Sequence, residues 1–146
     1  MKTLSTIPEQ IKTADRVLFN GQVTGTGDVK GVLPSGSNGI AIMCLVTMAN
    51  AADLALSIVT ADDADGTTPV AIADNIPIFV NDVRQTDAKA HTFTDDDSVN
   101  TVVFCVPPIL IPEDKYICLS FADSNDANIL SAVALDDVYH EEGASA

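Results

Sequence analysis

The sequence predicts an all-β protein, an antiparallel two-sheet β-sandwich, with an eight-stranded jelly roll as the leading topology. Apolar runs of strand length, rich in β-branched residues, recur along the chain, and acidic, Gly- or Pro-containing turns separate them. No amphipathic helix longer than two turns is evident. About eight strands at this spacing favour a jelly roll. An immunoglobulin-like sandwich is second, because Trp and a Cys-Trp-Cys pattern are absent.

Composition narrows the class of protein further. The chain has 146 residues, the size of one domain, and 47% of them are hydrophobic but only 5% aromatic, so aliphatic side chains must form most of the core. A formal charge of −14 opposes binding to nucleic acid or to an anionic membrane, since both depend on Lys and Arg. The N-terminus lacks the continuous apolar stretch of a secretion signal, so we expect synthesis in a cytoplasm.

The two ends of the chain differ from its middle. We interpret residues 1–12 as an N-terminal arm, because Pro8 breaks any long helix and apolar groups are few. A frayed tail and a segment that docks on another subunit explain this arm equally well. Residues 13–140 form the sandwich domain in this interpretation, and residues 141–146 form a short acidic C-terminal tail.

The first part of the domain is rich in turn residues. Asn20-Gly21 suits a two-residue hairpin because both positions tolerate positive φ, so we expect paired strands at Arg16–Phe19 and Gln22–Val23. Five glycines between residues 25 and 39 predict mainly loop, with one weak strand near Val29–Leu33.

Longer apolar runs predict the remaining strands. Ile40–Ala49 is apolar almost throughout, which indicates cover on both faces, either within the sandwich or on one side by a partner subunit. Pro77 restricts its strand to an edge or a strand start, and three prolines between residues 107 and 112 predict an extended crossover. The other expected strands are Leu54–Thr60, Ile76–Val83, Val99–Val106, Lys115–Phe121 and Ile129–Leu135.

Acidic segments invite comparison with cation sites, but no metal site and no cofactor is predicted. Asp62, Asp63 and Asp65 are weak candidates only, because an EF-hand alignment with Gly66 at position six leaves apolar residues at ligand positions one and twelve. An exposed turn explains this segment better. The run Asp95–Asp97 is likewise expected to be a solvated loop.

The sequence contains no recognisable catalytic constellation. Cys44, Cys105 and Cys118 fall within expected strands, and an odd number without Cys-x-x-Cys spacing indicates reduced core residues. His91 and His140 lie in polar segments without a neighbouring nucleophile signature. Phosphate-loop, dinucleotide and Gly-x-Ser-x-Gly motifs are absent. We therefore predict a protein without enzymatic activity.

Three segments together suggest a known class of protein: the early strand Ile11–Val17, the strand Leu54–Thr60 with its acidic turn up to Thr67, and the Pro-rich crossover Pro107–Phe121 that leads into a strand. Their organisation resembles that of the cement or decoration proteins of tailed bacteriophage capsids, in particular the jelly-roll type that sits on a shell of HK97-like major capsid protein. The likeness covers only part of the chain.

The resemblance implies a non-enzymatic virion structural protein on the outer surface of an icosahedral phage capsid, made in the host cytoplasm. Such a protein stabilises contacts between major capsid protein subunits and forms a dimer or trimer with itself, without nucleic acid or membrane as a partner. The residues expected at capsid or oligomer interfaces are Leu4, Ile7, Ile11, Val138 and Tyr139.

The alternative function is a jelly-roll module that binds sugars or a host surface, such as a receptor-binding or fibre domain. Sugar-binding surfaces usually present exposed aromatic rings. With no Trp, and with Tyr116 and Tyr139 as its two tyrosines, the chain is poorly equipped for this role.

Overall fold

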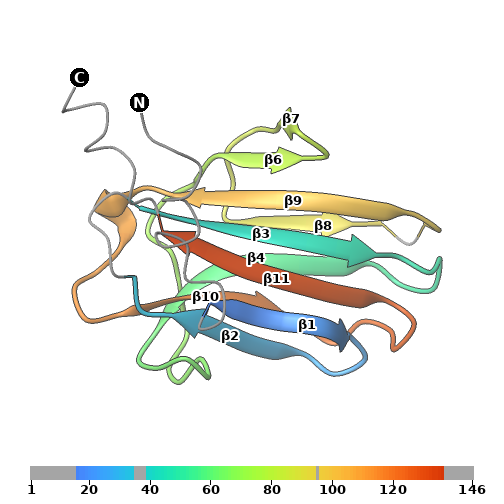
Figure 1. Cartoon of the computed structure of the whole chain (residues 1–146), viewed down its shortest axis with the longest axis horizontal. Coiled ribbons are helices and arrows are strands. Elements are labelled where there is room, and N and C mark those ends of the chain that lie inside the picture. The colour runs from blue at the N-terminus through green and yellow to red at the C-terminus, as the bar shows by residue number, and fades with distance from the viewer. Residues whose placement is uncertain (1–15, 35–38, 95, 137–146) are drawn as a thin grey trace, which may run out of the picture.

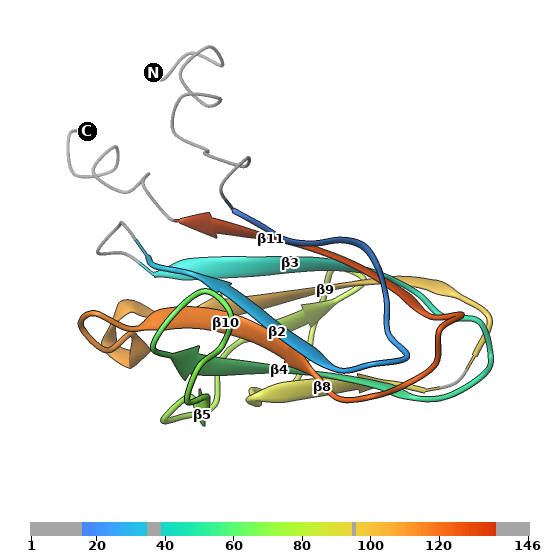
Figure 2. The same cartoon turned by 90° about the horizontal axis from the view of Figure 1, so that it is seen from below.

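The computed structural model describes residues 16–34, 39–94 and 96–136, which form two antiparallel sheets packed face to face (Figures 1 and 2). Sheet A contains, in spatial order, β1 (Val17–Val23), β11 (Ile129–Asp136), β3 (Ile40–Thr47), β9 (Val99–Val106), β6 (Ile78–Val80) and β7 (Val83–Arg84). Sheet B contains β2 (Asp28–Val32), β10 (Tyr116–Phe121) and β4 (Leu54–Ala61), with β8 (Ala90–Phe93) and β5 (Val70–Ala71) along one edge of β4. A short 3₁₀ helix, η2, spans Pro108–Leu110.

The strand order confirms the predicted all-β sandwich and is that of a jelly roll. Apart from the short strands β5, β6 and β7, sheet A runs β1-β11-β3-β9 and sheet B runs β2-β10-β4-β8. Along the chain, every connection between these principal strands crosses from one sheet to the other, except that from β4 to β8. An immunoglobulin-like sandwich keeps several consecutive strands in one sheet, so this alternative is excluded.

Alternation along each strand builds the core between the sheets. In β3, Ile42 and Val46 are fully buried, whereas the intervening Met43 and Leu45 point outward. Aliphatic side chains from both sheets fill most of the interior, as the composition requires. The buried aromatic residues are Phe19, Phe93, Phe104 and Phe121.

Two local predictions are wrong. Asn20-Gly21 does not form a hairpin, because β1 continues through it and pairs with β11 through register shifts. Gly21 adopts a φ of 61° there, and its N–H donates to Ser131 Oγ at 2.9 Å. Ile76–Val83 is not one strand, because Asn81 and Asp82 both have positive φ and form the two-residue turn between β6 and β7.

Candidate interaction surface

The outward side of sheet A carries a continuous row of apolar side chains. Strand register places Val17 beside Val133, Val133 beside Met43, and Met43 beside Val103. Phe79 of β6 continues the row next to Val103. The row ends at Arg84 of β7, whose guanidinium lies 5.6 Å from the centre of the Phe79 ring. Five strands therefore contribute to one apolar stripe before a charge appears.

Neighbouring rows extend this stripe into a surface without charged side chains. Leu45 lies between Ser131 and Thr101, and Ala41 lies between Leu135 and Cys105. We call the whole surface the sheet A face. Its members are Val17, Ala41, Met43, Leu45, Phe79, Thr101, Val103, Cys105, Ser131, Val133 and Leu135.

Several members of the sheet A face are well exposed. The relative exposure of Val17 is 49%, that of Leu45 is 48% and that of Met43 is 41%. A shallow hollow of about 500 Å³ lies over this region, with Asn20 and Asp82 among its polar lining residues. Clustered exposure of large apolar side chains is characteristic of interaction surfaces, whereas single exposed residues are ordinary.

The outward side of sheet B differs from that of sheet A, because the connection after β4 folds over it (Figure 2). In this connection, the Ala64 carbonyl accepts a hydrogen bond from the Gly31 N–H of β2 at 3.0 Å. A Cβ on Gly31 would lie 2.2 Å from Cys118 Sγ, so only glycine fits in this contact. Cys118 is buried although it belongs to the outward side of β10. Sheet B is thus partly covered by its own chain.

Ion pairs and hydrogen bonds hold this connection, residues 62–67, in place. Lys115 pairs with Asp62, and Lys30 pairs with Asp65 at 2.8 Å. Asp63 accepts hydrogen bonds from the Thr67 hydroxyl at 2.6 Å and from the N–H of Asp65 at 3.0 Å. The hydrogen bond from Lys115 lowers the pKa of Asp62, and the hydrogen bonds from Thr67 lower the pKa of Asp63.

These contacts give the three weak cation candidates another role. Asp62, Asp63 and Asp65 each have a partner from within the protein. Across residues 16–34, 39–94 and 96–136, no group of three or more His, Cys, Asp or Glu side chains is placed to hold a metal ion. The acidic segment therefore acts as a strap across sheet B, and we call residues 62–67 the strap.

Burial shifts the pKa values of Cys44, Cys118 and His91. Burial raises the pKa of the Cys44 thiol to about 12 and that of Cys118 to about 11. Cys105 is only half-buried, contrary to the expected core position, because it points outward on the sheet A face. Burial also lowers the pKa of His91, whose ring packs edge-on against Phe93 at 4.7 Å. These observations do not show a nucleophile paired with a general base.

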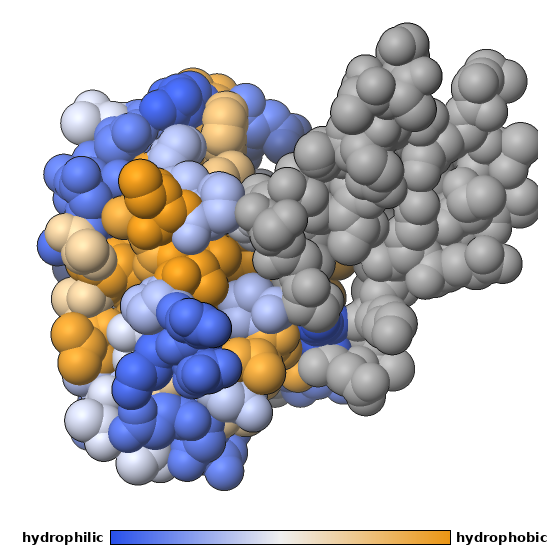
Figure 3. All heavy atoms as spheres, turned by 90° about the vertical axis from the view of Figure 1, so that its left-hand side faces the viewer, coloured by the Kyte–Doolittle hydropathy of each residue, from blue (hydrophilic) through white to orange (hydrophobic). Residues whose placement is uncertain are grey.

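A second, smaller apolar patch lies at the end of the sandwich that carries η2, and Figure 3 shows hydrophobic residues exposed at that end. Ile109 of η2 is 88% exposed, and Leu33 is 47% exposed. The crossover from β9 to β10 is not extended throughout as predicted, because Pro108–Leu110 form the 3₁₀ helix η2, whose first turn accommodates the fixed φ of proline. Ile109 makes this crossover an apolar tip. Leu4, Ile7, Ile11, Val138 and Tyr139, the residues predicted at interfaces, lie outside the described residues.

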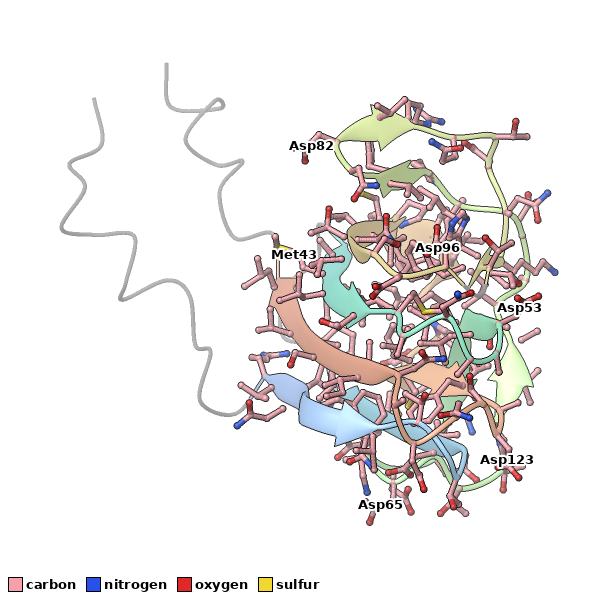
Figure 4. The ribbon with its side chains drawn as sticks, turned by 90° about the vertical axis from the view of Figure 1, so that its right-hand side faces the viewer. Met43, Asp53, Asp65, Asp82, Asp96 and Asp123 are labelled. Carbon is pink, nitrogen blue, oxygen red and sulfur yellow. The ribbon has the colours of Figure 1, made fainter. Side chains whose placement is uncertain are left out.

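Most acidic groups among the described residues lie away from the sheet A face, and Asp82, in the turn between β6 and β7, is the acidic residue that lines its hollow. In Figure 4, Met43 projects from the sheet A side, whereas Asp53, Asp96 and Asp123 lie in connecting loops. With the exception of Asp82, these acidic loops and the sheet A face are spatially separate. A protein surface of this kind can bind an apolar partner with little desolvation of its own carboxylates.

Comparisons with known proteins add no family. No protein-family model matches the chain, and no curated protein is significantly similar to it in sequence. Within the part of the chain that the structure describes, no helix has the length and apolar character needed to cross a membrane.

Sequence reasoning located one strand of the candidate surface but not the surface itself. Ile40–Ala49, for which the sequence predicts cover on both faces either within the sandwich or on one side by a partner subunit, contains Met43 and Leu45. A further signal was available, because β9 carries no charged residue on either side and β11 carries one only at its last position. What the sequence could not supply is the order in which these strands lie together.

Proposed function

We propose that this protein is a non-enzymatic virion structural protein that binds the outer surface of an icosahedral phage capsid and stabilises contacts between major capsid protein subunits. The observation that carries the proposal is the sheet A face, an uncharged apolar surface on a strongly acidic jelly roll. Such a surface suits protein contacts. The likeness in organisation to phage decoration proteins supplies the particular partner, an HK97-like major capsid protein.

Electrostatics supports the outer location. A chain with a formal charge of −14 is repelled by packaged DNA, so it is better suited to the outside of a shell than to its lumen. The same charge keeps an abundant protein soluble before it assembles. Many copies on a symmetric shell convert modest single contacts into firm attachment.

The sugar- or host-surface-binding alternative receives no specific support from the described surface. Four of the five phenylalanines are buried, and Phe79 is half-buried beneath Arg84. Tyr116 is also only half-buried, in β10. A sugar-binding platform needs exposed aromatic faces, which these residues do not provide.

The test is binding to undecorated, emptied shells assembled from the major capsid protein encoded in the same genome. We expect saturable co-sedimentation and a rise in the melting temperature of the shell. Deleting residues 1–12 tests whether the arm takes part in shell binding, since unchanged binding would show that the arm is not needed. Absence of co-sedimentation, combined with stabilisation of the protein in a glycan screen, would replace the proposal with the sugar-binding alternative.

A further inference from the structure

We propose that the sheet A face is a self-association surface, on which a second copy of this chain packs with its own sheet A face. This inference concerns the free protein before assembly, and it gives a second role to the surface that carries the proposed function. It assigns to specific residues a contact for which the sequence offered only a general expectation of a dimer or trimer.

The first argument is the unequal cover of the two sheets. The strap lies over sheet B and buries Cys118, whereas no segment among the described residues lies over Met43 and Leu45 of sheet A. Both sheets have apolar outward positions, so each gains from cover. Only sheet B receives it within the described chain.

The second argument is chemical complementarity. A partner for the sheet A face must bring an apolar, uncharged surface, because a charged side chain would lose its hydration there without compensation. In a chain with 21 acidic and 7 basic residues, the sheet A face is an extended uncharged area. A second copy brings the same chemistry, and an isologous contact pairs identical surfaces.

The third argument is size. Strands β11, β3 and β9 have eight residues each, β1 has seven and β6 has three. At about 4.8 Å between strands and about 3.3 Å rise per residue, this side of sheet A covers roughly 550 Å² in each copy. Two copies then bury roughly 1,100 Å² in total, the size of a weak or transient interface. The area therefore fits a weak, reversible homodimer.

Met43 marks the centre of the proposed contact. It occupies the middle of the row of five apolar side chains, between Val133 and Val103. In an isologous pair, residues near the centre of the surface lie close to the two-fold axis and meet their own copies. A charge at position 43 is therefore repeated across the axis and opposes association.

The experiment uses sedimentation velocity of the full chain over a concentration series up to about 100 µM. We expect a dimer, and we expect Met43→Glu to weaken association at least about 100-fold because two carboxylates are brought together in an apolar contact. The matched control is Val70→Glu, which adds the same charge at a 59% exposed position of sheet B. This control should dimerise like the unmodified protein.

Two additional measurements distinguish a second copy of this chain from another partner on the sheet A face. Added NaCl should tighten a contact between two acidic copies, whereas it would loosen a complex with a basic partner. Alkylation of Cys105, which lies on the sheet A face, should slow as the protein concentration rises, and Met43→Glu should abolish this protection. Thermal unfolding of both variants verifies that they are folded.

The proposal is overturned if the unmodified protein remains a monomer up to about 100 µM, or if Met43→Glu dimerises as well as Val70→Glu does. A monomer that dimerises only after removal of residues 1–15 would identify that segment as the occupant instead. Capsid co-sedimentation of the Met43→Glu variant separates the two proposals. A variant that loses the dimer but still binds the shell supports the inference made here, whereas a variant that keeps the dimer but loses shell binding overturns this inference and leaves the capsid proposal standing.

Discussion

At the scale of single residues, Asn128 shows how a polar side chain stabilises this fold from inside. It is fully buried, and its side chain joins two connections that are distant in sequence. Its Oδ1 accepts the Ala49 N–H at 2.9 Å, and its Nδ2 donates to the Ala52 carbonyl at 2.9 Å. Its backbone carbonyl accepts the Thr24 N–H at 3.1 Å. Asn128 therefore fastens three loops at one end of the sandwich.

Replacing Asn128 by Ala should lower the free energy of unfolding by about 2–3 kcal/mol, because its side chain loses the hydrogen bonds to the Ala49 N–H, the Ala52 carbonyl and Ser124 Oγ. Urea denaturation measures this loss. The matched control is Asn125→Ala, which removes one exposed hydrogen bond to the Ala127 N–H and should cost less than about 1 kcal/mol. Equal losses in the two variants would contradict the central role of Asn128.

His91 makes the stability of the folded protein depend on pH. Burial lowers its pKa below the usual 6.5, so the unfolded chain binds a proton more readily than the folded protein does. The contribution of neutral His91 is fully present above pH 6.5 and is lost as pH falls through the folded pKa. We expect the melting temperature to decline as pH falls below 6.5.

The His91→Gln variant tests this contribution, and its melting temperature should decline less as pH falls. His140→Gln removes the other histidine and measures its separate contribution. Asp62 and Asp63 do not interfere, since their lowered pKa values place their effect below pH 3.8. A slope unchanged by His91→Gln would assign the decline to other groups.

At the scale of elements, the strap decides which sheet is covered by the described part of the chain. Its acidic residues accept hydrogen bonds from its own backbone and pair with Lys30 and Lys115, so they stabilise this loop conformation. Gly66 adopts a φ of 80° within the turn, and a Cβ there would lie 2.4 Å from Val29. Local turn chemistry and close packing on β2 thus act together.

We expect Asp63→Ala to lower the melting temperature, because the N–H groups of Asp65 and Thr67 and the Thr67 hydroxyl lose their acceptor. In contrast, neither Ca²⁺ nor EDTA should shift the melting temperature of the unmodified protein. The contribution of Asp63 is present above pH 3.8 and is lost as pH falls through its lower folded pKa. Stabilisation by Ca²⁺ that disappears in Asp63→Ala would show that the strap binds a cation.

The element scale also shows why some strands were predictable. Val99–Val106 matches β9, and the expected strands at Ile40–Ala49, Leu54–Thr60 and Ile129–Leu135 each differ from the observed bounds by one or two residues. The alternation of apolar and polar residues was sufficient to predict these strands. At Asn20-Gly21 the same dipeptide chemistry fits a hairpin and a bulge, and pairing with β11 selected the bulge.

At the scale of the whole molecule, net charge opposes the compact state. Twenty-one acidic residues face seven basic ones, and the described ion pairs Lys30–Asp65, Arg84–Asp87 and Lys115–Asp62 are all at least partly exposed to solvent. Exposed pairs contribute little individually. General repulsion among the carboxylates should therefore outweigh them.

We expect the melting temperature to rise as NaCl is increased from about 0.05 M to about 0.5 M, because salt screens this repulsion. Differential scanning calorimetry at low protein concentration, where association is minimal, provides the measurement. An uncharged osmolyte at equal osmolality serves as the control for excluded-volume effects. A melting temperature that falls with NaCl would mean that the ion pairs dominate instead.

Local alternation and composition are sufficient to predict the all-β class, the positions of most strands, the aliphatic core and the acidic character. They do not predict that β11 lies between β1 and β3, that the strap covers part of sheet B, or that Met43 and Leu45 point outward. Pairing between strands that are distant in the sequence fixes which apolar face is covered, and this pairing depends on contacts that no local pattern encodes.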